Sequence, residues 1–345
     1  MKRILSLLLA AALTLSMTSC AKEKQKFSAH YFDWFDTVTS ITGYEYTQAD
    51  FDKVCDELET LLTEYHRLYD IYTLYDGVNN LAYVNRAKGE TVAVDGKIID
   101  LVELSRELNN QTQGKVNVAM GSVLKLWHDA RTWGISTPED AFLPDYDKLL
   151  EANEHTDFSL VVTDREAGTI TLNDPQLSLD VGAIAKGYAT EMAAEYLESL
   201  GRTGYVLNVG GNVRTVGTKP DGSKWLVGIE NPDTDSDEPY IAYLELAGES
   251  LVTSGSYQRF YYVDGKSYHH IIDPDTLYPG ERYLSVSVVC DDSGLADGYS
   301  TALFNMDLEE ALKLVNSTEG LEAMWVKPNG ERVFSDGFEG YIKAE

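Results

Sequence analysis

The stretch from residue 47 to residue 70 has the apolar spacing of an amphipathic helix. Apolar side chains recur at intervals of three or four residues from Phe51 to Leu68, and mostly polar residues occupy the positions between them. Thr47 stands where a helix N-cap is expected, because its hydroxyl can accept a hydrogen bond from a free backbone N–H group. We therefore predict a helix with one buried face.

Three shorter helices are predicted further along the chain, over residues 97–109, 183–200 and 307–315. Gly201 suits a left-handed C-cap at the end of the second of these helices. Asp307 and Glu310 have the spacing of a capping box at the start of the third.

The strands are recognised by the turns between them. The sequences "EAGT", "VDGK" and "KPNGER" each lie between β-rich stretches, as hairpin turns do. Further strands are predicted over residues 205–209, 225–229, 241–246, 259–263 and 284–289. Hairpins mixed with isolated helices favour an α+β fold with largely antiparallel sheets and flanking helices. We expect this domain over residues 29–345, after a spacer without regular structure over residues 20–28.

The first 19 residues have the pattern of an export signal. Lys2 and Arg3 are followed by an apolar run too short to span a bilayer. The sequence "MTSC" then resembles a bacterial lipobox, which implies cleavage before Cys20 and a lipid on its sulfur. We expect an exported protein, anchored by this lipid to the outer side of the cytoplasmic membrane; the alternative is an ordinary signal peptide. Cys55 and Cys290 then remain, and the sequence leaves open whether they pair.

The chain is strongly acidic, with 28 Lys and Arg residues against 56 Asp and Glu residues and a formal net charge of −28. Without residues 1–19, which hold two of the basic residues, the balance is 26 against 56, or −30. This balance argues against nucleic acid as a partner, because binding to nucleic acid needs a basic surface. An anionic ligand would need a local positive source, such as a helix N-terminus or a divalent cation.

One candidate for such a source lies in "LSLDVGAIAKGYATEM". An apolar strand leads into Asp180, and small residues then open a helix that carries Lys186 in its first turn. Free backbone N–H groups at this position can hold a phosphate. The alternative is that the small residues serve close packing and Lys186 faces solvent. The double glycine of "LNVGGNVR" is likewise either a turn or a place where the backbone approaches a ligand.

A second candidate lies in "ADGYSTALF", where Asp297 stands four residues before Thr301, beside Ser300. On a helix, residues four apart share a face, so the carboxylate and the hydroxyl would converge. Hard oxygen ligands of this kind suit Mg²⁺, although the same spacing also occurs by chance. The sequence has no Walker loop, no G-x-G-x-x-G and no G-x-S-x-G motif.

Two adjacent histidines end the predicted hairpin in "VDGKSYHHIIDP". Neighbouring side chains of a strand point to opposite faces, so His269 and His270 cannot both face one pocket without a bulge. We expect at most one of them to take part in chemistry.

Five segments in this order resemble the ApbE family of FAD:protein FMN transferases: "FDTVTSI", "DVGAIAKGYA", "LNVGGNVR", "TSGSYQRFYYVDGKSYHHIIDP" and "ADGYSTALF". The resemblance implies an exported α+β, T-fold-like enzyme with FAD in a cleft between two lobes. It implies that the enzyme needs Mg²⁺, splits FAD at its pyrophosphate and releases AMP. The FMN would be joined by a phosphoester bond to a threonine of an acceptor protein, such as a subunit of a membrane redox complex.

The resemblance also implies roles for individual residues. Those implied for Mg²⁺ are Ala183, Asp297, Ser300 and Thr301. Those implied for FAD are Phe35, Tyr72, Ala119, Met120, Gly121, Asp180, Lys186, Gly210, Gly211, Ser254, Arg259, His270 and Ile271. His270 would accept the proton of the attacking threonine, and Asp180 is assigned to catalysis with it. Tyr72 would lie against the flavin ring; if the alignment of this segment shifts, Tyr75 would take this role.

The chain departs from the family pattern in three places. Phe35 stands where the family commonly has methionine, and "VNVAMGS" replaces a pattern closer to "FDPTVGP". Leu277 and Tyr278 occupy the turn that usually contains glycine in "DPxTGxP".

Three other functions remain open at the level of sequence. Water could attack in place of threonine, which would make the protein a Mg²⁺-dependent FAD pyrophosphatase. The protein could also be a flavin-binding lipoprotein without turnover, or a lipoprotein that binds a different solute.

Overall fold

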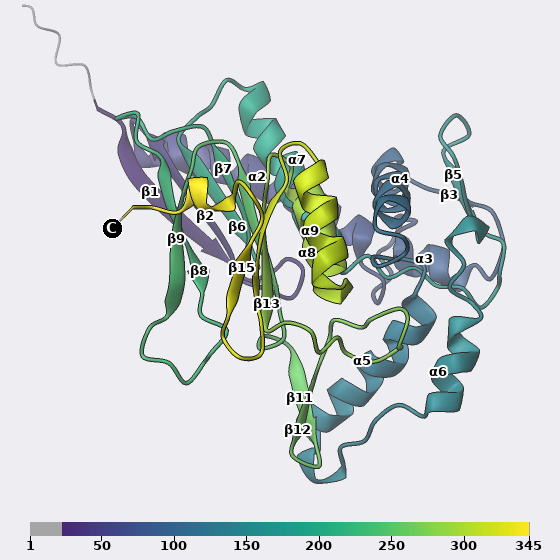
Figure 1. Cartoon of the computed structure of the whole chain (residues 1–345). Helices are drawn as coiled ribbons and strands as arrows, with labels where there is room; N and C mark the ends of the chain where they lie inside the picture. Colours follow the sequence, from purple (N-terminus) through teal and green to yellow (C-terminus); the bar gives the residue numbers. More distant parts are fainter. Residues whose placement is uncertain (1–22, 345) are drawn as a thin grey trace, which may run out of the picture.

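An eight-stranded antiparallel sheet forms the centre of the larger lobe (Figure 1). The computed structural model describes residues 23–344. In spatial order, the strands are β1 (Gln25–Tyr31), β2 (Thr39–Glu45), β6 (Tyr205–Val209), β7 (Asn212–Val216), β10 (Ser250–Gly255), β13 (Ser285–Cys290), β14 (Glu322–Val326) and β15 (Arg332–Phe334). Every residue of β13 is buried, because both faces of the sheet are covered.

Helices cover one face of this sheet and a hairpin covers the other (Figure 1). The helices are α2 (Gln48–Tyr69), α7 (Ala185–Ser199), α8 (Ser293–Asn305) and α9 (Leu308–Ser317). Their apolar faces form the main core with the sheet. The hairpin consists of β8 (Trp225–Glu230) and β9 (Tyr240–Leu246), and it encloses a second core around Leu244 and Met324.

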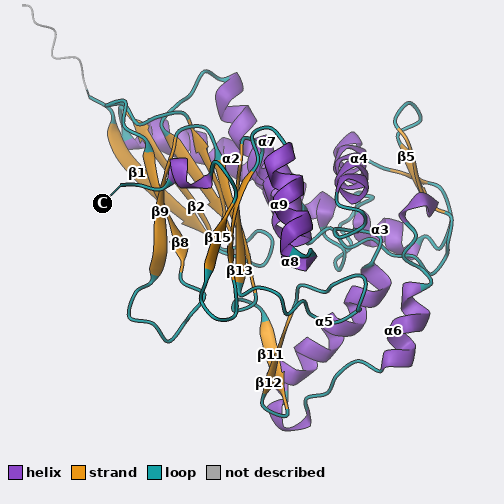
Figure 2. Ribbon diagram, viewed as in Figure 1, coloured by secondary structure: helices purple, strands orange, loops and turns teal. Residues whose placement is uncertain are grey.

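The smaller lobe is mainly helical and lies beside the helical face of the sheet (Figure 2). Its elements are α3 (Leu81–Arg86), β3 (Val92–Ala93), α4 (Gly96–Gln111), α5 (Gly121–Ser136), α6 (Tyr146–Asn153), β4 (Val161–Asp164) and β5 (Thr169–Leu172). Short 3₁₀ helices cover Pro138–Asp140 and Phe158–Leu160 here, and Phe338–Tyr341 near the C-terminus.

One hairpin joins the two lobes. Strands β11 (Phe260–Val263) and β12 (Lys266–His269) pair with each other, outside the large sheet, and pack on α5 (Figure 2). Their turn has Asp264 and Gly265 at positive φ, 50° and 79°, as a tight two-residue hairpin turn requires. Tyr261 of β11 and Trp127 of α5 belong to one buried cluster. This packing places the end of β12 next to α5.

The predicted α+β class is confirmed, and the predicted strands and hairpin turns all occur. The helix over 47–70 is α2, with Thr47 accepting a hydrogen bond from the Asp50 N–H at 3.1 Å. Gly201 follows α7 at a φ of +67°, as expected for a left-handed cap.

Three details differ from the sequence expectations. Strand β1 begins at Gln25 and pairs with β2, so residues 25–28 belong to the sheet and not to a spacer. Helix α7 begins at Ala185, two residues later than predicted. The capping box of α9 does not form, because the Asp307 carboxylate accepts a hydrogen bond from Arg282 at 3.0 Å and caps no backbone N–H group.

Cys55 and Cys290 are both buried and free. The predicted signal peptide and Cys20 lie outside the described residues. Within residues 23–344, no helix combines the length and the apolar character that crossing a membrane requires.

Candidate active site

A cavity of about 700 Å³ lies where the two lobes meet the β11–β12 hairpin. Its lining comes from the loop before β2, the end of α2, the helices α5, α7 and α8, strand β10, and the segments beside β11 and β12. Of the residues proposed from sequence, these line it: Phe35, Tyr72, Met120, Asp180, Ala183, Lys186, Gly210, Ser254, Arg259, His270, Ile271, Asp297 and Thr301. Segments more than 200 residues apart in the sequence therefore meet at one place.

Four of the proposed residues do not line the cavity. Ala119 is buried in the main core. Gly121 packs against Ser178, where an added Cβ would lie 2.5 Å from the Ser178 carbonyl oxygen. Gly211 lies in the turn between β6 and β7, and Ser300 is fully buried behind Asp297. For Ser300 the reason is geometric: its hydroxyl donates to the Asp297 carbonyl oxygen at 2.9 Å, one helical turn back.

The wall formed by α7 and α8 carries a buried carboxylate. Asp297 is 5% exposed, and its Oδ2 atom accepts a hydrogen bond from the Gly187 N–H at 2.9 Å and lies 3.5 Å from Lys186 Nζ. The absence of a side chain at Gly187 makes this contact possible, since an added Cβ would lie 2.2 Å from the Ser293 carbonyl oxygen. Burial raises the pKa of Asp297, whereas Lys186 and the Gly187 N–H act in the opposite direction.

Three hydroxyl groups lie together on β10 and on the same helix as Asp297. The Ser254 hydroxyl lies 2.8 Å from that of Ser300 and 3.5 Å from that of Thr301. Asp297, Thr301 and Ser254 therefore present oxygen atoms at one end of the cavity, together with the backbone of Ala183. Oxygen donors around a desolvated carboxylate are the chemistry that Mg²⁺ prefers, so the residues present fit this ion. No group of three His, Cys, Asp or Glu side chains placed to hold a metal occurs among residues 23–344, so hydroxyl and backbone oxygen atoms would have to complete such a site.

Asp180 lies at the foot of the same wall, directly before α7. Its Oδ1 atom accepts a hydrogen bond from the Gly182 N–H at 2.9 Å. Burial raises the pKa of Asp180, and the Gly182 N–H and the cations nearby oppose this shift. Lys186 donates to the Gly182 carbonyl oxygen at 3.2 Å, so it is held over the start of the helix and does not extend into solvent.

The adjacent histidines point to different surroundings, as strand geometry predicts. His269 is 8% exposed, its Nε2 atom lies 2.7 Å from the Gly280 carbonyl oxygen, and its Nδ1 atom accepts from the Ile271 N–H at 3.2 Å. It therefore holds the loop after β12. His270 faces the cavity, and its Nδ1 atom is buried with no hydrogen-bond partner among the described residues. Burial, with Arg259 and Arg131 nearby, lowers the pKa of His270 from 6.5 to about 3.

Several cavity residues were not found from the sequence, and two of them are the polar residues His128 and Arg131 on α5. The Nδ1 atom of His128 lies 3.2 Å from the hydroxyl of Tyr72 and 3.4 Å from a guanidinium nitrogen of Arg131, and the rings of His128 and Tyr72 are 5.0 Å apart. The apolar spacing of Val123, Trp127 and Ala130, which are all buried, was a usable signal for this helix.

The departures from the family pattern are accommodated locally. Phe35 adopts a φ of 54° and packs its ring edge-on against His66. Leu277 adopts a φ of 61°, which is unusual for a residue other than glycine, but its side chain is buried and its carbonyl oxygen accepts from Trp127 Nε1 at 2.8 Å. The packing of Leu277 on α5 thus holds the loop in a conformation that glycine adopts freely.

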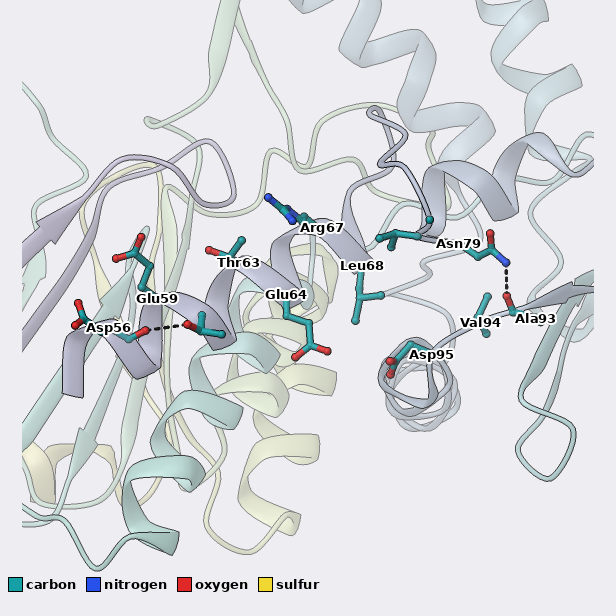
Figure 3. Close-up of a pocket in the computed structure, with 13 residues that line it drawn as sticks. Asp56, Glu59, Thr63, Glu64, Arg67, Leu68, Asn79, Ala93, Val94 and Asp95 are labelled. Carbon is teal, nitrogen blue, oxygen red and sulfur yellow. Dashed lines mark hydrogen bonds between the residues drawn. The ribbon is translucent and has the colours of Figure 1, made fainter. Parts of the chain in front are cut away.

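A second and larger cavity, of about 940 Å³, lies along the outer side of α2 (Figure 3). Its lining carries four carboxylates, those of Asp56, Glu59, Glu64 and Asp95, and one arginine, Arg67. None of the residues proposed from sequence lines it. The acidic lining also disfavours a phosphate-bearing ligand, so the cavity between the lobes is the candidate active site.

Comparison with known proteins agrees with this choice. The model of the ApbE family matches residues 35–325. The chain belongs to the ApbE family. It is 31% identical over 271 residues to a FAD:protein FMN transferase of Klebsiella pneumoniae, covering 78% of this chain and 81% of that protein. A FAD:protein FMN transferase of Haemophilus influenzae is 28% identical over 323 residues, covering 91% and 90% of the two chains.

Among solved structures, the ApbE protein of Thermotoga maritima superposes with a TM-score of 0.81 at 25% sequence identity. The superposition covers 93% of this chain and all of that one. The fold is therefore that of the ApbE family throughout the two lobes.

Proposed function

We propose that this protein is a FAD:protein FMN transferase that joins FMN to a threonine of an acceptor protein and releases AMP. One observation carries the proposal: His270 faces the cavity that also holds Asp297, Thr301 and the N-terminus of α7. A group able to accept a proton thus lies beside groups able to hold a phosphate. The names of the relatives support the same activity.

In the proposed reaction, the threonine hydroxyl attacks the phosphorus atom that carries the riboflavin group. The imidazole of His270 accepts the hydroxyl proton, the new phosphoester bond forms, and the bond to the AMP phosphate breaks. With a pKa of about 3, His270 is neutral at physiological pH and has a free lone pair, but it is a weak base. The negative charge of a bound pyrophosphate would oppose the effect of the two arginines, and we expect the pKa of His270 to rise when FAD binds.

Mg²⁺ belongs to this proposal because the oxygen donors present fit it. Asp297, Thr301 and the Ala183 backbone would hold the ion, with Ser254 near it. When bound, Mg²⁺ neutralises phosphate charge and so stabilises the leaving group. The α7 N-terminus and Lys186 contribute further positive potential from the chain itself.

The product decides between this function and its alternatives. The protein is incubated with FAD, Mg²⁺ and a threonine-bearing acceptor, and the masses of the acceptor and of the small products are measured. We expect the acceptor to gain the mass of FMN and AMP to appear in equal amount. Free FMN with AMP would indicate a FAD pyrophosphatase, and unchanged FAD would indicate a binding protein.

We also propose that Cys20 carries a lipid and anchors the protein to the outer side of the cytoplasmic membrane, near acceptors that belong to membrane redox complexes. The support is the "MTSC" sequence after a short apolar run. Cys20→Ala should release the protein from membranes or leave it uncleaved. Partition of the wild-type protein wholly into the aqueous phase of a detergent extraction would reject the anchor.

A further inference from the structure

Four basic side chains, apart from histidines, line the active-site cavity, and they fall into two pairs. The two lysines have carboxylate partners: Lys115 lies 2.6 Å from Asp275, and Lys186 lies 3.5 Å from Asp297. The two arginines, Arg131 and Arg259, have none. Among residues 23–344, no carboxylate oxygen lies within 4.0 Å of either guanidinium group. This is unusual in a chain with twice as many acidic as basic residues.

The arginines come from different elements that the fold brings together. Arg131 lies on α5, and Arg259 directly precedes β11, which packs on α5. The approach of these elements is close, since a Cβ added to Gly134 would lie 2.5 Å from the ring of Tyr261. The polar contacts of the two side chains are weak: a nitrogen of Arg131 lies 3.4 Å from His128 Nδ1, and a nitrogen of Arg259 donates to the Asp36 carbonyl oxygen at 3.4 Å.

The two positive charges act on each other. Burial lowers the pKa of Arg131, and Arg259 is the charged group with the next largest effect. Arg259 and Arg131 also act on His270 more strongly than Lys186 does. Asp180 of the same cavity acts on Arg131 in the opposite direction, but from beyond ion-pair distance. Like charges that have no ion-pair partner cost free energy that a bound anion would recover.

We propose that Arg131 and Arg259 form a phosphate-binding subsite for the dinucleotide, separate from the N-terminus of α7 and next to His270. A pyrophosphate carries two anionic phosphate groups. The N-terminus of α7 and a metal ion would bind one of these groups. The planar fork of a guanidinium group matches the oxygen atoms of a phosphate, and two such forks from facing elements would fix its position. The inference rests on the proposed function, because it assumes that the anionic ligand is FAD.

The test measures equilibrium affinity without an acceptor, so that it does not depend on transfer. Wild type, Arg131→Gln and Arg259→Gln are titrated with FAD, with ADP and with riboflavin, each in the presence of Mg²⁺. Arg165→Gln is the matched control, because Arg165 pairs with Asp100 on the surface outside the cavity. We expect each cavity variant to lose about tenfold or more in affinity for FAD and ADP, and its FAD affinity to depend less on salt. Affinity for riboflavin, which has no phosphate, should change less than twofold.

Two results would overturn the subsite. Equal losses for riboflavin and FAD would show that the arginines only support the shape of the cavity. Unchanged FAD and ADP affinities would remove the arginines from phosphate binding, and a raised KM for the acceptor in the same variants would then assign them to an acidic group of the acceptor. Arg131→Lys, which keeps the charge but not the fork, should recover part of the lost affinity. If wild type binds FAD but modifies no acceptor, the proposed function fails while the subsite is still tested.

Discussion

The two walls of the cavity differ in chemistry. The wall of α7, α8 and β10 offers oxygen atoms, those of Asp297, Thr301 and Ser254. The wall of α5 and the β11–β12 hairpin offers nitrogen atoms, those of His270 and the two arginines. The first wall suits a hard cation and the second suits anions and protons. A strongly acidic protein can therefore hold a pyrophosphate, because two arginines lie on one wall, and Lys186 lies on the other beside oxygen atoms that fit a cation.

The walls also differ in how they are held. Asp297 is fixed by backbone contacts between two buried helices that pack closely at Gly187. His270 follows directly on a strand of a two-stranded hairpin, and its neighbour His269 secures the loop by binding the Gly280 carbonyl oxygen. The oxygen wall is thus held by contacts between buried helices, and the nitrogen wall by the apolar cluster between α5 and the hairpin together with the His269 contact.

The largest effect is expected on the nitrogen wall. His270→Asn keeps much of the size of the side chain but removes the proton acceptor, so the single-turnover rate of transfer should fall by about 10²- to 10⁴-fold. Affinity for FAD should stay within a few-fold of wild type. His269→Asn, as the neighbouring control, should leave the rate nearly unchanged and lower stability, because it loses the contact with Gly280. Near-normal transfer by His270→Asn would remove His270 from the mechanism, and a parallel loss of FAD affinity and stability would make it a structural residue.

On the oxygen wall, Asp297→Ala removes the carboxylate that we assign to the metal ion. The rate of AMP release should fall by about 10²- to 10³-fold, since several kcal/mol of charge stabilisation is lost. Affinity for FAD should no longer depend on Mg²⁺, and removal of Mg²⁺ from wild type by a chelator should have the same effect. Asp235→Ala, on the exposed loop between β8 and β9, is the control. Full activity of Asp297→Ala at ordinary Mg²⁺ concentrations would show that the ion, if needed, is held elsewhere.

A substitution of Tyr72 tests whether this side chain shields the flavin from water. It is 52% exposed at the cavity and is held by His128. If the ring covers the flavin and restricts water, Tyr72→Asn should raise free FMN relative to modified acceptor by a few-fold, as the loss of about 1 kcal/mol of stacking predicts. The product ratio is measured by mass and chromatography. An unchanged ratio would mean that Tyr72 does not control access of water.

The last prediction concerns the stability of the fold against pH, and not catalysis. His270 has a pKa of about 3 in the folded protein against 6.5 for a free side chain, so between these values the unfolded chain binds a proton that the folded chain does not. The free energy of unfolding should therefore decrease as the pH falls from 6.5 towards 3, and His270→Asn should lose less stability over this range. The contribution is read from urea unfolding of both proteins at several pH values. Parallel curves for the two proteins would indicate that His270 titrates normally in the folded state.

Much of the fold follows from local patterns. The 3.6-residue spacing from Phe51 to Leu68 and the turn residues Asp264 and Gly265 determine their elements through short-range physics, and the structure contains both. Helix α5 shows the same apolar spacing, but the polar side chains that it presents to the cavity are His128 and Arg131. Neither residue belongs to a motif, so local patterns do not reveal their role.

The sequence by itself determined the class of fold, the order of the motifs and the fact that only one of two adjacent histidines could face a site. Alternation along a strand and periodicity along a helix are properties of the backbone, and they can be read without knowing the rest of the chain. Only the tertiary structure decided which partners each side chain meets. It buried Ser300 and bonded it to the Asp297 carbonyl oxygen, paired Asp307 with Arg282, and brought Arg131 and Arg259 to one cavity. These outcomes depend on how distant elements pack, and packing between elements is a property of the whole chain.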